Sequence, residues 1–118
     1  AHVPVVTAEG HDRAIAYTSD LPHVVATSLM NSRSYSEETK YFIGGSFRDE
    51  TRVADINEDL WTSLFLSNRE KLVEEIDRFR EALDRAREAI AAGSEEDIRK
   101  FLKEAGRRRR EMIDHGSH

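Results

Sequence analysis

An apolar stripe at helical spacing, between residues 69 and 92, is the feature that most limits the fold of this chain. Its successive apolar residues are 4, 3, 4, 3 and 4 positions apart: Leu72, Ile76, Phe79, Leu83, Ala86 and Ile90. This spacing places them on one side of a single long helix, and such a stripe packs against another helix. The second helix belongs either to the same subunit or to another one, and the pattern is compatible with both.

The composition favours a helical protein. The chain has 118 residues, 38% of them hydrophobic and 35% charged, with only two prolines and six glycines. It has no cysteine, which excludes disulfides, thiolate metal sites and cysteine nucleophiles. No stretch approaches the roughly 18 apolar residues that a membrane span needs. We therefore expect a single all-α domain, soluble and cytoplasmic, with no membrane partner.

The N-terminal half is expected to form one long helix followed by two short ones. Thr7 can cap a helix over residues 8–30, and Pro22, which has no N–H to donate, should kink it. A glycine pair and polar turn residues bound the short helices, at 37–43 and at 47–54.

The C-terminal half is expected to hold three more helices. Asn57 begins the first, Ser67 or Asn68 caps the long helix with the stripe, and Gly93 ends it. Ser94 then begins the last helix. The apolar residues of this helix that should be buried are Ile98, Phe101, Leu102 and Ala105.

The first helix has a polar line along one side. At about 100° per residue, Asp12, Ser19 and His23 lie within an arc of roughly 40°. The opposite side should be core: Ala14, Thr18, Leu21, Val25 and Leu29. Ala16 and Ala26, beside the polar line, would leave room for a ligand. A solvated surface is the commoner origin of such a line, but a histidine directly after a helix-breaking proline favours function.

A second candidate region begins at Gly44 and Gly45. Arg48 and Arg52 follow as i,i+4 neighbours, and either guanidinium could bind a carboxylate through two parallel hydrogen bonds. The alternative is surface pairing with nearby acids, which are Asp49, Glu50 and Asp55. The glycines follow no strand and lack the G-x-G-x-x-G spacing, so they do not predict a dinucleotide loop.

The run Arg107 to Arg110 is the strongest basic feature. It lies in a chain with a net charge of -5 and no aromatic residues alternate with the arginines. The C-terminal part of a helix also favours cations for structural reasons. We therefore expect no nucleic acid partner, and because the histidines lack metal-ligand spacing, no metal site.

Three segments in order resemble the C-terminal helical domain of prephenate dehydrogenases. They are residues 11–23, with the sequence HDRAIAYTSDLPH, residues 44–52, with GGSFRDETR, and residues 57–61. The resemblance extends over nearly the whole chain, residues 1–118. It implies an all-helical dimerisation domain, like the C-terminal domain of 6-phosphogluconate dehydrogenase, that forms a homodimer. It further implies a separate N-terminal Rossmann domain, absent from this chain, against which the domain closes the substrate cleft.

The resemblance also implies a reaction and a set of site residues. Members of the family oxidise and decarboxylate prephenate to 4-hydroxyphenylpyruvate for tyrosine synthesis, with NAD or NADP. The cofactor and the principal catalytic histidine would belong to the missing domain, so this chain alone should be inactive and bind no cofactor. The substrate-binding residues implied here are His23, Arg52, Ser19, Asp12, Gly45 and Trp61. Arg52 matches the arginine that holds a carboxylate, whereas Arg48 matches a basic residue not tied to substrate.

Two positions depart from the family pattern. The family usually has a histidine at the position of Asp20 and often a third glycine at that of Ser46. An extra acid near the pocket could favour an aminated substrate, so an arogenate dehydrogenase domain is one alternative. The other is a non-catalytic helical dimerisation module, in which the stripe of the long helix is the whole function.

Overall fold

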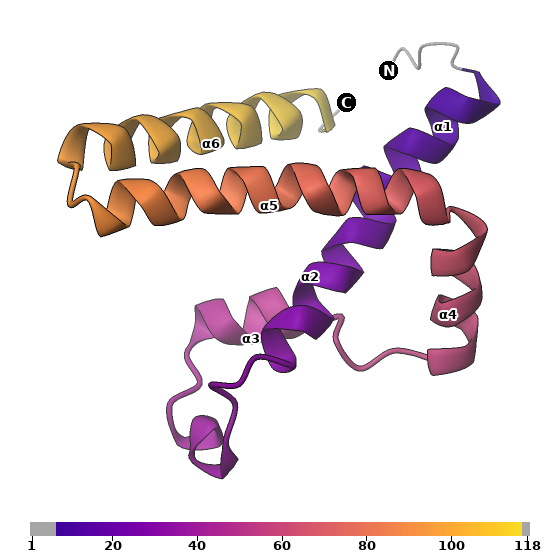
Figure 1. Cartoon of the computed structure of the whole chain (residues 1–118), viewed down its shortest axis with the longest axis horizontal. Coiled ribbons are helices and arrows are strands. Elements are labelled where there is room, and N and C mark those ends of the chain that lie inside the picture. Colours follow the sequence, from indigo (N-terminus) through magenta and orange to yellow (C-terminus); the bar gives the residue numbers. More distant parts are fainter. Residues whose placement is uncertain (1–6, 117–118) are drawn as a thin grey trace. The chain divides into compact units, whose positions relative to one another are not determined.

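The computed structural model describes residues 7–116, and all regular structure in that range is helical, as the composition predicts (Figure 1). The chain divides into two compact units, one ending at Ile76 and the other beginning at Asp77. No helix in the described range is long and apolar enough to cross a bilayer. The first unit contains every residue predicted to bind substrate, and the second contains the exposed end of the apolar stripe.

The expected helix over residues 8–30 is three segments. α1 spans Ala8–Ile15, the π-helix η1 spans Ala16–Asp20, and α2 spans Leu21–Met30. Thr7 caps α1 as predicted, since its hydroxyl accepts from the Gly10 N–H at 2.9 Å. In η1 the N–H of Leu21 donates to the carbonyl of Ala16, five residues back. The helix therefore changes before the proline rather than at it, and Pro22 lies in the first turn of α2, where a missing N–H matters least.

The predicted core side of the first helix is only partly correct, because Leu21 is buried and Val25 is half-buried but the other three residues are exposed. Ala14 and Thr18 are exposed and Leu29 is 40% exposed. The residues of this segment that are buried are Ala16, Asp20, Leu21 and Ala26. A five-residue turn rotates everything after it relative to α1, so a single 100° step cannot be applied across it. Ala16 and Ala26 are packed against protein, which corrects the expectation that they leave room for a ligand.

Short elements carry the chain from α2 to α5. The 3₁₀ helix η2 spans Glu37–Tyr41, α3 spans Gly45–Thr51, and α4 spans Glu58–Ser67. α3 packs against α2. It begins and ends earlier than the predicted 47–54, because the Gly44 carbonyl already accepts the first helical hydrogen bond, from Arg48. Asn57 caps α4 as predicted, its side-chain oxygen accepting from the Leu60 N–H at 2.9 Å.

Helix α5 spans Arg69–Ala91 and α6 spans Glu95–Gly116. Gly93 ends α5 with φ 63°, the left-handed conformation that glycine adopts most easily. Ser94 caps α6 as predicted, accepting from the Asp97 N–H at 3.2 Å. Asn68 stands directly before α5 as predicted, and its carbonyl accepts from the Leu72 N–H. Its side chain does not cap the helix, because the Asn68 amide bonds elsewhere, and the Ser67 hydroxyl donates back to the Leu64 carbonyl.

The apolar stripe of α5 is buried only at its start. Leu72 is 5% exposed, whereas Leu83 and Ile90 are 56% and 66% exposed. On α6, Ile98 and Phe101 are half-buried, but Leu102 is 62% exposed, so the predicted burial of Leu102 and of Ala105 is wrong. The buried apolar residues of the described chain are Ala16, Leu21, Ala26, Leu72 and Ala89. A single copy therefore leaves much of its apolar surface in water.

Candidate functional site

His23 is half-buried on α2 and its ring is oriented by the backbone. Its Nδ1 lies 2.7 Å from the carbonyl oxygen of Ser19, one turn earlier. A carbonyl oxygen can only accept, so Nδ1 carries a proton and Nε2 is the nitrogen left to meet a ligand. The neutral ring offers a lone pair at Nε2, and the protonated ring offers a second donor. Ser19, predicted as a polar site residue, makes this contact through its backbone.

Trp61 of α4 covers one face of the His23 ring. The ring centroids are 3.8 Å apart and the planes differ by 24°, which is a stacked arrangement. Phe65, one turn further along α4, meets the edge of the indole with centroids 5.7 Å apart. Such aromatic pairs add to the stabilisation from burial alone. The structure thus brings together two of the predicted residues that lie 38 positions apart in the sequence.

Asp20 is a buried charged residue of this region, at 4% exposure. Burial raises the pKa of its carboxyl group, while a hydrogen bond from the Asn68 side chain and the nearby charge of His23 act in the opposite direction. The Asn68 amide also donates to the backbone carbonyl of Asp12, at 2.8 Å. Asp12 therefore contributes its carbonyl to this cluster, and its own carboxylate is exposed beside His11.

The helix α3 holds the other two predicted residues. Gly45 is its first residue, and a Cβ built there meets no atom within 4 Å, so packing does not require glycine. Arg52 follows the last residue of α3 and is exposed, as is Arg48. Neither arginine forms an ion pair with any residue between 7 and 116, so the alternative of surface pairing is not what this structure adopts. No hydrogen bond in the described chain joins them to His23, and their substrate-binding roles stay predictions.

The sequence analysis missed the tertiary hydrogen bonds of Asn68 and did not anticipate the burial of Asp20. Asparagine is a residue type that often caps helices, and Asn68 lies between the end of α4 and the start of α5, where a cap is expected. The side chain instead reaches residues 56 positions away. One pattern could have pointed to it. Trp61 and Asn68 are seven positions apart, close to two helical turns, so Asn68, directly after α4, follows the side of that helix that carries Trp61.

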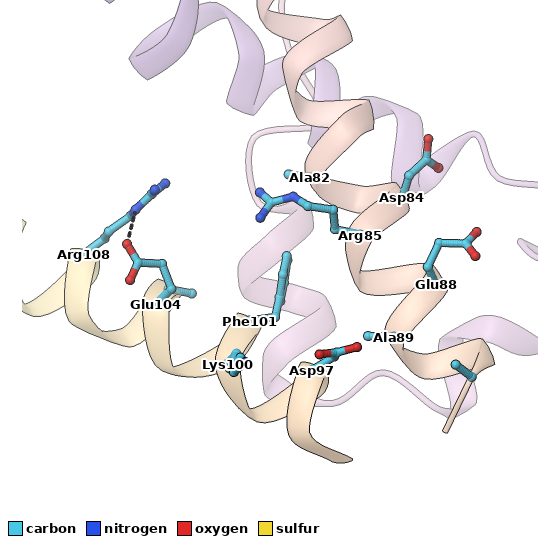
Figure 2. Close-up of a pocket in the computed structure, with 12 residues that line it drawn as sticks. Ala82, Asp84, Arg85, Glu88, Ala89, Asp97, Lys100, Phe101, Glu104 and Arg108 are labelled. Atoms are coloured by element: carbon cyan, nitrogen blue, oxygen red, sulfur yellow. Dashed lines mark hydrogen bonds and ion pairs between the residues drawn. The ribbon is translucent and has the colours of Figure 1, made fainter. Parts of the chain in front are cut away.

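A separate groove lies between α5 and α6 and contains none of the six predicted site residues (Figure 2). Its volume is about 750 Å³, and small alanines from both helices line it beside Phe101. The guanidinium of Arg85 lies 5.7 Å from the centre of the Phe101 ring. The Arg108 side chain pairs with Glu104 at 3.0 Å (Figure 2). The charged side chains that line the groove are exposed and of both signs, so they partly neutralise one another. A site for a small anion would instead present mainly positive charge.

The comparisons with known proteins agree with one another. Residues 7–104 match the family model described as prephenate dehydrogenase, dimerization domain. The chain is 33% identical over 115 residues to a prephenate dehydrogenase of Lactococcus lactis subsp. cremoris, covering 94% of this chain and 32% of that protein. It is 35% identical over 112 residues to a cyclohexadienyl dehydrogenase of Zymomonas mobilis, covering 91% of this chain and 38% of that protein.

A solved structure is similar along the same length. It is the prephenate dehydrogenase from A. aeolicus in complex with hydroxyphenyl propionate and NAD+, with a TM-score of 0.84 and 31% identity. The match covers 94% of this chain and 40% of that one. The chain thus spans about a third of the curated relatives that it matches, at 32%, 29% and 38% of their lengths.

Proposed function

The chain belongs to the prephenate dehydrogenase family through its dimerization domain, residues 7–104, and from this we propose its role in a complete enzyme. Residues 1–118 are the dimerisation and substrate-binding part of a cytoplasmic homodimer that oxidises and decarboxylates prephenate to 4-hydroxyphenylpyruvate for tyrosine synthesis. The family match over most of the chain is the observation that carries this proposal. The stacked His23 and Trp61 support it, since they place a titratable ring beside an aromatic surface.

We assign the nucleotide to another domain of the enzyme. The described residues form no strand, and the sequence has no G-x-G-x-x-G turn, which are the parts that hold a dinucleotide in a Rossmann fold. NAD or NADP would accept the hydride when bound there. The task left to this chain is to hold the substrate and exclude water, so the fragment alone should have no activity.

The ligand of the A. aeolicus relative, hydroxyphenyl propionate, is an aromatic carboxylate. Two groups of this chain suit such a ligand. The exposed guanidinium of Arg52 can hold a carboxylate by two parallel hydrogen bonds. Nε2 of His23 can contact a second polar group, with Trp61 covering the ring from one side. We therefore treat both as binding residues rather than as proton-transfer catalysts of the hydride step.

The alternative substrate is arogenate, which carries an ammonium group. A free carboxylate near His23 would favour arogenate, because it could pair with the ammonium group. The carboxylate of Asp20, however, is buried and hydrogen-bonded by Asn68. We therefore favour prephenate. Comparing kcat/KM of the full-length enzyme for the two substrates tests this choice, and a clear preference for arogenate would contradict it.

Two arginine variants of the full-length enzyme test the site. Arg52→Ala should lose about 2 to 4 kcal/mol of transition-state stabilisation, mostly as a higher KM, because a bidentate carboxylate contact is removed. Arg48→Ala is the matched control, because Arg48 is also exposed and precedes Arg52 by four residues, and it should lose much less. Equal losses from the two variants would show that Arg52 is not the carboxylate-binding residue.

A further inference from the structure

We propose that Asn68 and Asp20 are positioning residues for the His23–Trp61 pair. In this arrangement the Asn68 amide is a two-way clamp that holds α4 against the helical segment that carries His23. The effect on substrate rests on the proposed function, but the clamp itself is a property of this chain. Neither residue is among the six that the family resemblance implies for binding.

The clamp begins with the two N–H groups of one side-chain amide. Asn68 Nδ2 donates to the Asp12 carbonyl at 2.8 Å, and the Asn68 side chain also hydrogen-bonds the carboxylate of Asp20. Asp12 lies in α1 and Asp20 is the last residue of η1, so the amide bonds on both sides of the wide π turn. A neutral amide has two N–H donors, which matches these two acceptors. It therefore ties α4 to two successive parts of the first segment.

Burial of Asp20 indicates that its side-chain oxygen, as a hydrogen-bond acceptor, has a specific task. A carboxylate at 4% exposure loses solvation that only hydrogen bonds and opposite charge can replace. An apolar side chain of similar size would fill the same space without that penalty. The carboxylate is bonded to Asn68 and is close enough to His23 to feel its charge. Its position thus links the amide to the ring that would face the ligand.

The spacing of the contacting residues along both helices explains how the hydrogen bonds of Asn68 can position Trp61 against His23. Trp61 and Asn68 are seven residues apart on one side of α4 and its end. Their partners, His23 and Asp20, are three residues apart on the first segment. Two contacts along α4 fix both its distance from the first segment and its rotation about its own axis. With one contact alone, α4 could still rotate about that axis. The stack at 3.8 Å therefore depends on the hydrogen bonds of Asn68, about two helical turns further along.

The fluorescence of Trp61 reports on the stack, because it is the only tryptophan of the chain. In Asn68→Ala, we expect the emission to change in the direction of His23→Asn, in which the stacking ring is replaced. The exposed helix-end residue Asn31 provides the control, and Asn31→Ala should keep the wild-type emission. In the full-length enzyme Asn68→Ala should raise KM by roughly 10- to 100-fold, with a smaller change in kcat.

The variants of Asp20 separate positioning from general stability. Asp20→Asn keeps an acceptor for the amide and should retain the emission and a KM within about twofold of wild type, whereas Asp20→Ala should behave like Asn68→Ala. Far-UV circular dichroism establishes that each variant is folded. If Asn68→Ala does not fold, the comparison of Asp20→Asn with Asp20→Ala decides whether the clamp positions the His23–Trp61 pair.

Wild-type emission in a folded Asn68→Ala, or equal damage from Asp20→Asn and Asp20→Ala, would overturn the clamp. A changed emission in Asn68→Ala, together with no turnover of prephenate by the wild-type enzyme, would support the clamp and refute the proposed function.

Discussion

Leu83→Ala tests whether the exposed end of the apolar stripe forms a subunit interface. Complete burial of a leucine side chain stabilises by about 1.5 to 3 kcal/mol. Leu83 is 56% exposed, so association can bury at most about that share, or roughly 0.8 to 1.7 kcal/mol per copy. A twofold dimer loses this association free energy once in each copy. Alanine retains part of the contact, so the full loss is not reached. At about 1.4 kcal/mol per factor of ten, we expect the dimer dissociation constant to rise by roughly 10- to 100-fold.

Sedimentation equilibrium over a range of concentrations measures this constant directly. Leu72→Ala is the matched control on the same helix, because Leu72 is only 5% exposed within one copy. It should lower the free energy of unfolding by about 2 to 5 kcal/mol through cavity formation. An unchanged dissociation constant in Leu83→Ala, or a wild-type chain that sediments as a monomer at tens of micromolar, would refute the reasoning.

Three further outcomes are expected. His23→Asn should reduce kcat/KM of the full-length enzyme by less than about 100-fold, because loss of a general base costs about 100- to 10,000-fold; a loss in that larger range would make His23 the base. Gly93→Ala should lower the free energy of unfolding by about 1 kcal/mol, since Gly93 has φ 63°, whereas Gly45→Ala, in open space, should leave it nearly unchanged in urea titrations. Hydrogen bonds from Arg107 and then Arg108 lower the pKa of Glu104 from 4.5 to about 2, so its stabilisation is complete above about pH 4.5 and is lost as the pH falls toward 2. The difference in melting temperature between wild type and Glu104→Gln should shrink over that range, and a constant difference would argue against this ion pair.

The sequence predicts well those features that depend on neighbouring residues. Thr7, Asn57 and Ser94 each cap the helix that follows them, and Gly93 ends α5. In each case the hydrogen bond or the backbone angle involves residues within a few positions, so the local sequence is sufficient. The all-helical fold follows from these local choices together with the periodic stripe of α5.

Features that depend on distant residues could not be predicted in the same way. Asp20 is buried and hydrogen-bonded by the side chain of Asn68, which is far away in the sequence, and no local pattern specifies that contact. Asn68 has two competing uses, as a cap and as a tertiary donor, and only the packed structure selects the second. The pairing of His23 with Trp61 could be anticipated only as two members of a family site, because helical arithmetic places His23 but says nothing of α4. The roles of Gly45 and Arg52 stay predictions.

The π turn at Ala16–Asp20 contains one residue more than an ordinary helical turn. Loss of one residue within it would convert the wide turn into an ordinary one without breaking the helix. The turn itself would absorb the loss, so α2 would face nearly the same way relative to α1, and His23 would stay beside Trp61. Loss of one residue from the regular part of α1 or α2 would instead turn everything beyond it by about 100° and shift it by about 1.5 Å along the helix axis. A one-residue gap within these five residues in an aligned relative that keeps Asp20 is therefore compatible with the same site, whereas a gap in the flanking helices would mark a differently built one.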